Sequence, residues 1–239
     1  MCLLCLTFTP LSAAIIQDTP AFGPLSGTGL GNVSTVLTIN SPGSTTSSTG
    51  CSYWDGSSSQ TGAGCPVSGF GGDELALNST YTIADLGLAT FADLRIIYNS
   101  SEPGGAANSV TLQNLVLILQ SSDGTPIADF TPLSLTAPIF YPDVAQGTGN
   151  AGFFFRLDDA GVTAANAFWA SLGNSTDLRI GLAALVNDEE DGGNETFFLA
   201  NAGGATPDPD TIPEPQSAVL IGTGILLVGL FSSKKRRRA

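Results

Sequence analysis

The densest group of side chains that could do chemistry lies in the stretch NDEEDGGNE, at residues 187–195. Carboxylate and amide oxygens are the ligands that Ca²⁺ prefers, and a loop that contains glycine can fold them around an ion. The spacing differs from that of an EF-hand, and acidic surface turns are usually only solvated. Two interpretations therefore stay open, a calcium site and a solvated turn. The candidate ligands are Asn187, Asp188, Glu189, Glu190, Asp191 and Asn194.

The composition of the chain limits the kinds of catalysis to consider. It contains no histidine, which excludes a Ser-His-Asp or Cys-His nucleophile and a metal held by imidazole. A glycosidase that uses two carboxylates stays chemically feasible. However, Asp158, Asp159 and the acids of 187–195 show no recognisable catalytic spacing. We therefore expect no enzyme activity, and a secreted polysaccharide hydrolase with paired carboxylates is the alternative.

Two of the four cysteines, Cys51 and Cys65, bracket a loop rich in Gly and Ser. A C-x13-C spacing without histidine is a poor zinc site. In an oxidising compartment these two residues are expected to form a disulfide. Closing a loop of about 15 residues would stabilise the fold by roughly 3 kcal/mol. The alternative is a pair of free, buried thiols.

Tyr53 and Trp54 lie between these cysteines, among Ser and Gly residues. Exposed aromatic rings in a polar loop are unusual and often serve recognition. They are our candidates for a platform on which sugar rings stack. The alternative is that both rings fold back over the edge of a sheet.

The elements that must position these residues are mainly strands. Runs rich in β-branched and aromatic residues, bounded by Gly, Pro and Asn, predict short strands. The Asp-Gly pair of SSDGT, at residues 121–125, predicts a hairpin. About eight such strands predict an all-β fold, an antiparallel sandwich or jelly roll. The predicted strands are 33–39, 80–86, 94–99, 109–120, 126–130, 152–157, 178–186 and 195–200.

One helix interrupts the strands. Residues 158–173 begin with Asp, continue with helix formers and end at Gly173, which predicts a helix of about three turns. Its Phe168 and Trp169 are expected to pack against the sheet, with stacking of Trp169 on a ligand as the alternative.

Three stretches are predicted to lack regular structure: residues 15–32, the Ser/Thr/Gly-rich residues 40–72, and a Pro-rich linker at 201–211. The folded domain is expected to span residues 15–200.

The charge of the chain is divided unevenly. Before Ser233 the basic residues are Arg95, Arg156 and Arg179, whereas the chain has 21 Asp and Glu residues. An acidic body repels phosphate backbones, so we expect no nucleic-acid partner. Few charged residues and abundant Gly, Ser, Thr and Asn are typical of an extracellular β-protein.

The opening residues 1–14, MCLLCLTFTPLSAA, predict a signal peptide. Leu3–Leu11 is apolar, and Ser12 and Ala14 supply the small residues for cleavage after Ala14. The usual basic region is missing, so either Met1 is a misassigned start or the front is truncated. A buried N-terminal strand is the alternative.

The last part of the chain combines an apolar run, 217–231, with the basic residues Lys234, Lys235, Arg236, Arg237 and Arg238. Fifteen residues make about 22 Å of helix, which is short for a bilayer core of about 30 Å. Two following serines and snorkelling lysines make a span feasible. The basic residues suit a stop-transfer signal and place the acidic body outside the cytoplasm. The alternative is a core helix or strand.

Pro213, Glu214 and Pro215 precede this run, and the three parts in this order resemble the PEP-CTERM sorting signal of Gram-negative, exopolysaccharide-producing bacteria. The resemblance covers residues 212–239 alone, and Ile212 stands where the family often has Val. It implies that an exosortase, a membrane-embedded cysteine protease or transpeptidase, recognises Pro213–Pro215 and removes the tail.

The resemblance also implies a location and partners. The precursor is expected to sit transiently in the inner membrane, through a transmembrane helix at 217–231, before release to the cell surface or matrix. A structural or adhesive role in contact with exopolysaccharide is the function that we expect for the body.

Overall fold

A computed structural model of the chain describes residues 13–18, 34–40, 47–62, 64–75, 78–100, 109–124, 133–141, 152–188 and 194–203. The chain divides into two units, residues 1–204 and 205–239, and every described residue belongs to the first. That unit is mainly β. Predictions that fall on 205–239 therefore lie outside the described residues.

The described residues form twelve strands, two α-helices and one 3-10 helix. In chain order they are β1 (Ala14–Asp18), β2 (Ser34–Asn40), β3 (Ser48–Trp54), β4 (Ser59–Thr61), β5 (Tyr81–Thr82), α1 (Ile83–Leu86), η1 (Phe91–Asp93), β6 (Leu94–Asn99), β7 (Val110–Gln120), β8 (Leu133–Leu135), β9 (Ile139–Tyr141), β10 (Gly152–Leu157), α2 (Asp159–Ser171), β11 (Arg179–Asp188) and β12 (Asn194–Asn201).

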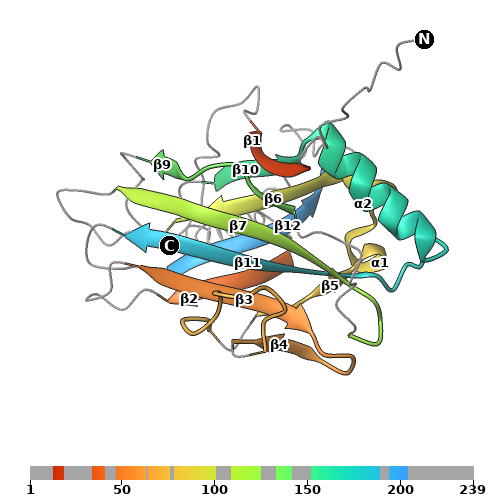
Figure 1. The fold of residues 1–239 in the computed structure, drawn as a ribbon, viewed down its shortest axis with the longest axis horizontal. Coiled ribbons are helices and arrows are strands. Elements are labelled where there is room, and N and C mark those ends of the chain that lie inside the picture. The colour runs from red at the N-terminus through yellow and green to blue at the C-terminus, as the bar shows by residue number, and fades with distance from the viewer. Residues whose placement is uncertain are drawn as a thin grey trace, which may run out of the picture. The chain divides into compact units, whose positions relative to one another are not determined.

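All twelve strands belong to one curled sheet. Their order is β2-β12-β6-β10-β1-β8-β7-β11-β3-β4, with β5 paired to β11 and β9 paired to β7. The pairs are antiparallel except β1 with β8. In Figure 1, β7, β11 and β3 cross in front of β6 and β12. The main core lies between these parts of the sheet, because Leu117 and Leu182 share one buried cluster with Tyr98 and Phe197.

Asp73 and Glu74 connect β2, at one end of the curled sheet, with β3, the strand next to its other end. The backbone N–H of Asn40, at the end of β2, donates to the carbonyl of Asp73 over 2.7 Å. Along the edge of β3, the N–H of Thr49 donates to Asp73 Oδ2 (2.9 Å) and that of Cys51 donates to Glu74 Oε1 (3.0 Å). Two carboxylates thus occupy backbone donors that β4 does not reach.

Most predicted strands are confirmed. β6 and β10 have the predicted bounds, and β2, β7, β11 and β12 differ by one or two residues at an end. The predicted helix is confirmed as α2, which lies beside β10 (Figure 1). Phe168 and Trp169 pack on the core as expected. The predicted strand 126–130 lies outside the described residues.

The prediction of an irregular stretch at 40–72 is wrong, because β3 and β4 form within it. β3 turns small residues towards the core where it faces β2. A Cβ atom at Gly50 would lie 2.6 Å from Ile39 Cγ1, and Ser48 and Ser52 are fully buried. Little room remains for the large apolar residues that usually mark a strand.

Two further predictions need correction. Residues 80–86 are not one strand, because Thr82 caps a helical turn and β5 ends there. Nor is 15–32 wholly irregular, since β1 extends from Ala14 to Asp18 and pairs on both edges. Ala14, the last residue of the predicted signal peptide, therefore lies inside a strand.

No helix among the described residues is long and apolar enough to cross a membrane. The predicted transmembrane helix, the Pro213–Pro215 element and the basic residues lie outside these residues. Of the predicted linker 201–211, only 201–203 are described, and Asn201 belongs to β12.

Candidate functional site

The predicted disulfide is confirmed: Cys51 and Cys65 are bonded, with their Cα atoms 6.0 Å apart. Cys51 belongs to a second buried cluster with Val116, Ile118 and Ala183, on the side of the sheet that faces away from the main core. Tyr53, Cys65, Val67 and Phe70 cover this cluster. The disulfide therefore attaches a loop to the outer face of β3, β11 and β7.

Tyr53 and Trp54 are the last two residues of β3, and their rings make different contacts. Tyr53 packs on the outer cluster. The Arg179 guanidinium carbon instead lies 3.9 Å from the centre of the Trp54 ring, a cation–π contact. The indole Nε1 of Trp54 donates to the Ser122 carbonyl (2.8 Å).

The backbone of Trp54 is held by Gln120, a buried residue at the end of β7. The N–H of Trp54 donates to Gln120 Oε1 (2.6 Å), and Gln120 Nε2 donates to the Trp54 carbonyl (2.7 Å). The turns that follow the two strands then pack on each other: a Cβ atom at Gly124 would lie 2.2 Å from the amide nitrogen of Gly56. A half-buried indole beside a cation is thereby held in a fixed place, an arrangement suited to stacking on a polar ring.

In the first of these turns, Asp55 accepts hydrogen bonds from Ser57 and Ser58. The N–H of Ser58, then that of Ser57, holds the pKa of Asp55 below its usual value. The carboxylate therefore stays charged and closes its own turn.

Of the acidic candidates, Asp158 and Asp159 lie within the described residues. Asp158 caps α2, because its Oδ1 accepts from the N–H of Gly161 (2.6 Å), and the same oxygen accepts from the N–H of Ala14 (3.1 Å). Asp159 is exposed in the first turn of α2. The observed contacts of Asp158 are therefore structural.

The acidic loop of the predicted calcium site is described only at its borders. Asp188 ends β11 and Asn194 begins β12, whereas 189–193 lie outside the described residues. Within the described part of the chain, no group of three or more acidic or cysteine residues could hold a metal ion. The calcium site stays a prediction.

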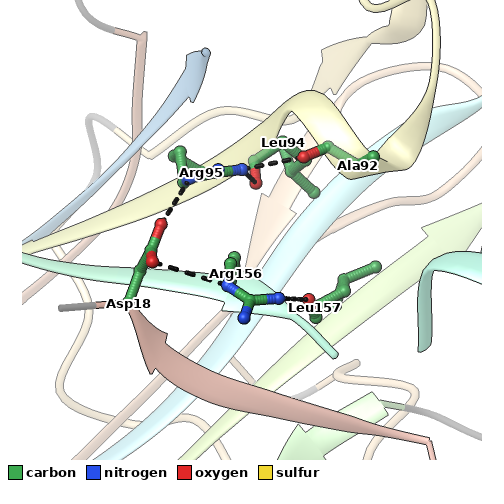
Figure 2. Close-up of polar contacts among 6 residues, drawn as sticks. All are labelled: Asp18, Ala92, Leu94, Arg95, Arg156 and Leu157. Carbon is green, nitrogen blue, oxygen red and sulfur yellow. Dashed lines mark hydrogen bonds and ion pairs between the residues drawn. The ribbon is translucent and has the colours of Figure 1, made fainter. Parts of the chain in front are cut away.

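One charged cluster was not found from the sequence. Figure 2 shows Asp18 between two guanidinium groups, with one carboxylate oxygen directed at each. Arg95 Nε lies 2.8 Å from Asp18 Oδ2, and Arg156 Nε lies 3.4 Å from Asp18 Oδ1. These side chains come from β1, β6 and β10, far apart in the sequence. Only the strand register brings them together, so no local motif could have revealed the cluster.

Backbone carbonyls hold the two guanidinium groups of this cluster. Arg95 Nη1 donates to the carbonyls of Ala92 and Leu94, and Arg156 Nη1 donates to the carbonyl of Leu157 (Figure 2). The cluster ties three neighbouring strands together on the face opposite the core.

A cluster of aromatic side chains lies near the part of the sheet where β9 pairs with β7. Tyr141 stacks on Phe153, with ring centres 3.9 Å apart, and Tyr98 stacks on Phe197 (4.8 Å). Burial raises the pKa of the Tyr141 hydroxyl well above its ordinary value. Among the described residues, that hydroxyl has no hydrogen-bond partner.

No family model, curated protein or solved structure matches the chain.

Proposed function

We propose that this chain is an exported surface or matrix protein that an exosortase sorts and processes. One observation carries the proposal: Pro213-Glu214-Pro215, the apolar run 217–231 and five basic residues at 234–238 follow one another in this order. The prolines disfavour helix before the apolar run, which leaves the chain extended and accessible to a protease. In the precursor, residues 217–231 form a transmembrane helix.

The described body supports this proposal in two ways. The Cys51–Cys65 disulfide suits an oxidising compartment outside the cytoplasm. The mainly β body has few charged residues, and acids outnumber bases among them. In this proposal the curled sheet is a two-layered sandwich ectodomain whose role is structural or adhesive.

The sorting proposal is tested by fractionating cells of the producer with and without its exosortase. We expect a smaller, released body only when the enzyme is present. Pro213→Ala with Pro215→Ala should leave the full-length protein in the membrane. Pro207→Ala with Pro209→Ala, in the linker, is the matched control and should be processed normally. Identical products in all strains would contradict the proposal.

The adhesive part of the proposal is contact with exopolysaccharide through Trp54 and Arg179. The Arg179 guanidinium lies over one face of the Trp54 ring, and aromatic and cationic groups together suit a sugar polymer that carries acidic groups. Tyr53, which was predicted to share the platform, covers the outer cluster instead.

Retention of the released protein on the producer's own exopolysaccharide tests this contact. Trp54→Ala should weaken retention, whereas Phe140→Ala should not. Phe140 is the matched control because it is 54% exposed on β9, away from Trp54. Equal retention of both variants would contradict the contact. Shortening of the polymer would instead favour the hydrolase alternative.

A further inference from the structure

Asp158 makes two hydrogen bonds with the backbone of Ala14 at the start of β1. Its N–H donates to Asp158 Oδ1 (3.1 Å), and its carbonyl accepts from the N–H of Asp158 (3.0 Å). Ala14 is 3% exposed and the next residue, Ile15, is fully buried. The first peptide group of β1 thus lies against the N-terminus of α2.

Removal of a leader after Ala14 would disturb this junction. Both hydrogen bonds to Asp158 would be lost, and the new α-ammonium would belong to Ile15, whose side chain is buried between Leu157 and Leu135. The Ala14 carbonyl would also disappear from the positive end of α2, and a cation would take its place. A buried charge without a partner is strongly unfavourable.

Removal after Ala13 has a different result. The α-ammonium of Ala14 would then occupy the place where the Ala14 N–H already meets Asp158 Oδ1. An ammonium–carboxylate hydrogen bond is about twice as strong as a neutral one. The cleavage would remove only the half-buried methyl group of Ala13 from the edge of the core.

We propose that the mature chain begins at Ala14 and that Asp158 binds its α-ammonium group. This inference rests on the proposed export, and it moves the expected cleavage by one residue. A leader peptidase would hydrolyse the Ala13–Ala14 bond. Water supplies the hydroxyl of the Ala13 carboxyl group and the proton of the Ala14 amine. Ala13 would be the small residue directly before the cleaved bond, and Leu11 would be the third residue before it.

Sequencing the N-terminus of the released protein tests the position of the bond. A sequence that begins Ala-Ile-Ile-Gln supports the proposal. A sequence that begins at Ile15, or upstream of Ala14, overturns it while leaving export intact. A chain that is never exported would instead contradict the proposed function, so the two failures are distinguishable.

The pairing has its own test, the dependence of stability on pH above neutrality. A free α-ammonium has a pKa of about 7.7–8.0, and the carboxylate beside it raises this pKa in the folded state. The pair therefore stabilises the fold fully below about pH 7.7, and its contribution is lost as the pH rises through the raised pKa.

The charged groups on the elements packed against this junction are Asp159 on α2, Arg156 on β10 and Asp93 on η1, whereas the described residues of β7 and β8 contribute none. Carboxyl and guanidinium groups in general have reference pKa values outside the range from pH 7 to pH 10. A change in the effect of Asp158 over the range therefore reports the α-ammonium.

The variant Asp158→Asn removes the charge and keeps a good helix cap. We expect the melting temperature of the released wild-type protein to exceed that of Asp158→Asn at pH 7, and the gap to narrow by pH 10. Asp159→Asn, one residue along and exposed, should show a constant gap. If the difference in melting temperature between the wild type and Asp158→Asn does not change with pH, the proposed pairing is overturned.

Discussion

Asp18 connects three strands by charge, although its own strand, β1, is the shortest of the three. Its two oxygens face Arg95 of β6 and Arg156 of β10. The side chains are 22% to 35% exposed, so solvent screens the pairs and each is expected to be modest.

A double-mutant cycle measures this cluster. Asp18→Asn combined with Arg95→Gln should give a coupling free energy of about 0.2–1 kcal/mol, decreasing in high salt. Pairing Asp18→Asn with Arg179→Gln, whose guanidinium lies on Trp54 instead, is the control and should be additive. A coupling of zero at low salt would show that the contacts in Figure 2 do not stabilise the fold.

Gly124 and Gly173 separate two effects of an added methyl group. Both have a positive φ, of 78° and 68°, which strains any other residue. A Cβ atom at Gly124 would also lie 2.2 Å from the backbone of Asp55, whereas at Gly173 it would meet nothing within 4 Å. The two positions therefore share a conformational penalty and differ in a steric one.

We expect Gly173→Ala to lower the free energy of unfolding by about 1 kcal/mol and Gly124→Ala to lower it by more. Urea unfolding of both variants at one pH gives the comparison. Equal losses would mean that the turns after β3 and β7 do not pack as closely as the structure shows.

At the scale of elements, α1 is a single turn that depends on its cap. The N–H of Asp85 donates to Thr82 Oγ1 (3.0 Å), and the N–H of Thr82 donates to Asp85 Oδ2 (2.9 Å). The N–H of Thr82, followed by its hydroxyl group, lowers the pKa of Asp85. A lowered carboxyl pKa stabilises the fold above the ordinary value of about 3.9, and this contribution is lost as the pH falls through the lowered pKa.

Asp85→Asn should therefore lower stability at pH 7 by a few tenths to about 1 kcal/mol. The difference from wild type should begin to shrink as the pH falls below about 3.9 and should vanish only below the lowered pKa of Asp85. Urea unfolding between pH 7 and pH 2.5 measures this decrease. A difference that stays constant over the whole range would mean that the charge of Asp85 is not what closes the cap.

The same elements show what could be predicted from the sequence. LRIIYN and GFFFRL were predicted correctly because large β-branched and aromatic residues fill their core positions. β3 was missed because Gly50 and Ser52 face a crowded part of the core that admits only small side chains. Residues 80–86 were misassigned because the cap at Thr82 overrides a β-like composition.

The candidate site was predicted only in part, for a related reason. The disulfide follows from two cysteines and their surroundings, which are visible in the sequence. The different contacts of Tyr53 and Trp54 depend on β3, and that strand was not predicted. The Asp18 cluster depends on a register between distant strands.

At the scale of the whole molecule, the disulfide restricts the unfolded chain and holds a loop on the outer face. Reduction should lower the free energy of unfolding by about 3 kcal/mol. Denaturant unfolding with and without a reductant checks this value. The double variant Cys51→Ala with Cys65→Ala should resemble the reduced protein and ignore the reductant. Unchanged stability on reduction would contradict the prediction.

The carboxylates that border β3 affect the tendency of the protein to aggregate at high concentration. An uncovered strand edge is a template on which another chain can add a strand, and crowded proteins then aggregate. Asp73 and Glu74 occupy the donors of Thr49 and Cys51 with side-chain oxygens, and a carboxylate offers an incoming strand no donor in return. These carboxylates therefore protect this edge of the sheet against strand addition by a second copy of the chain.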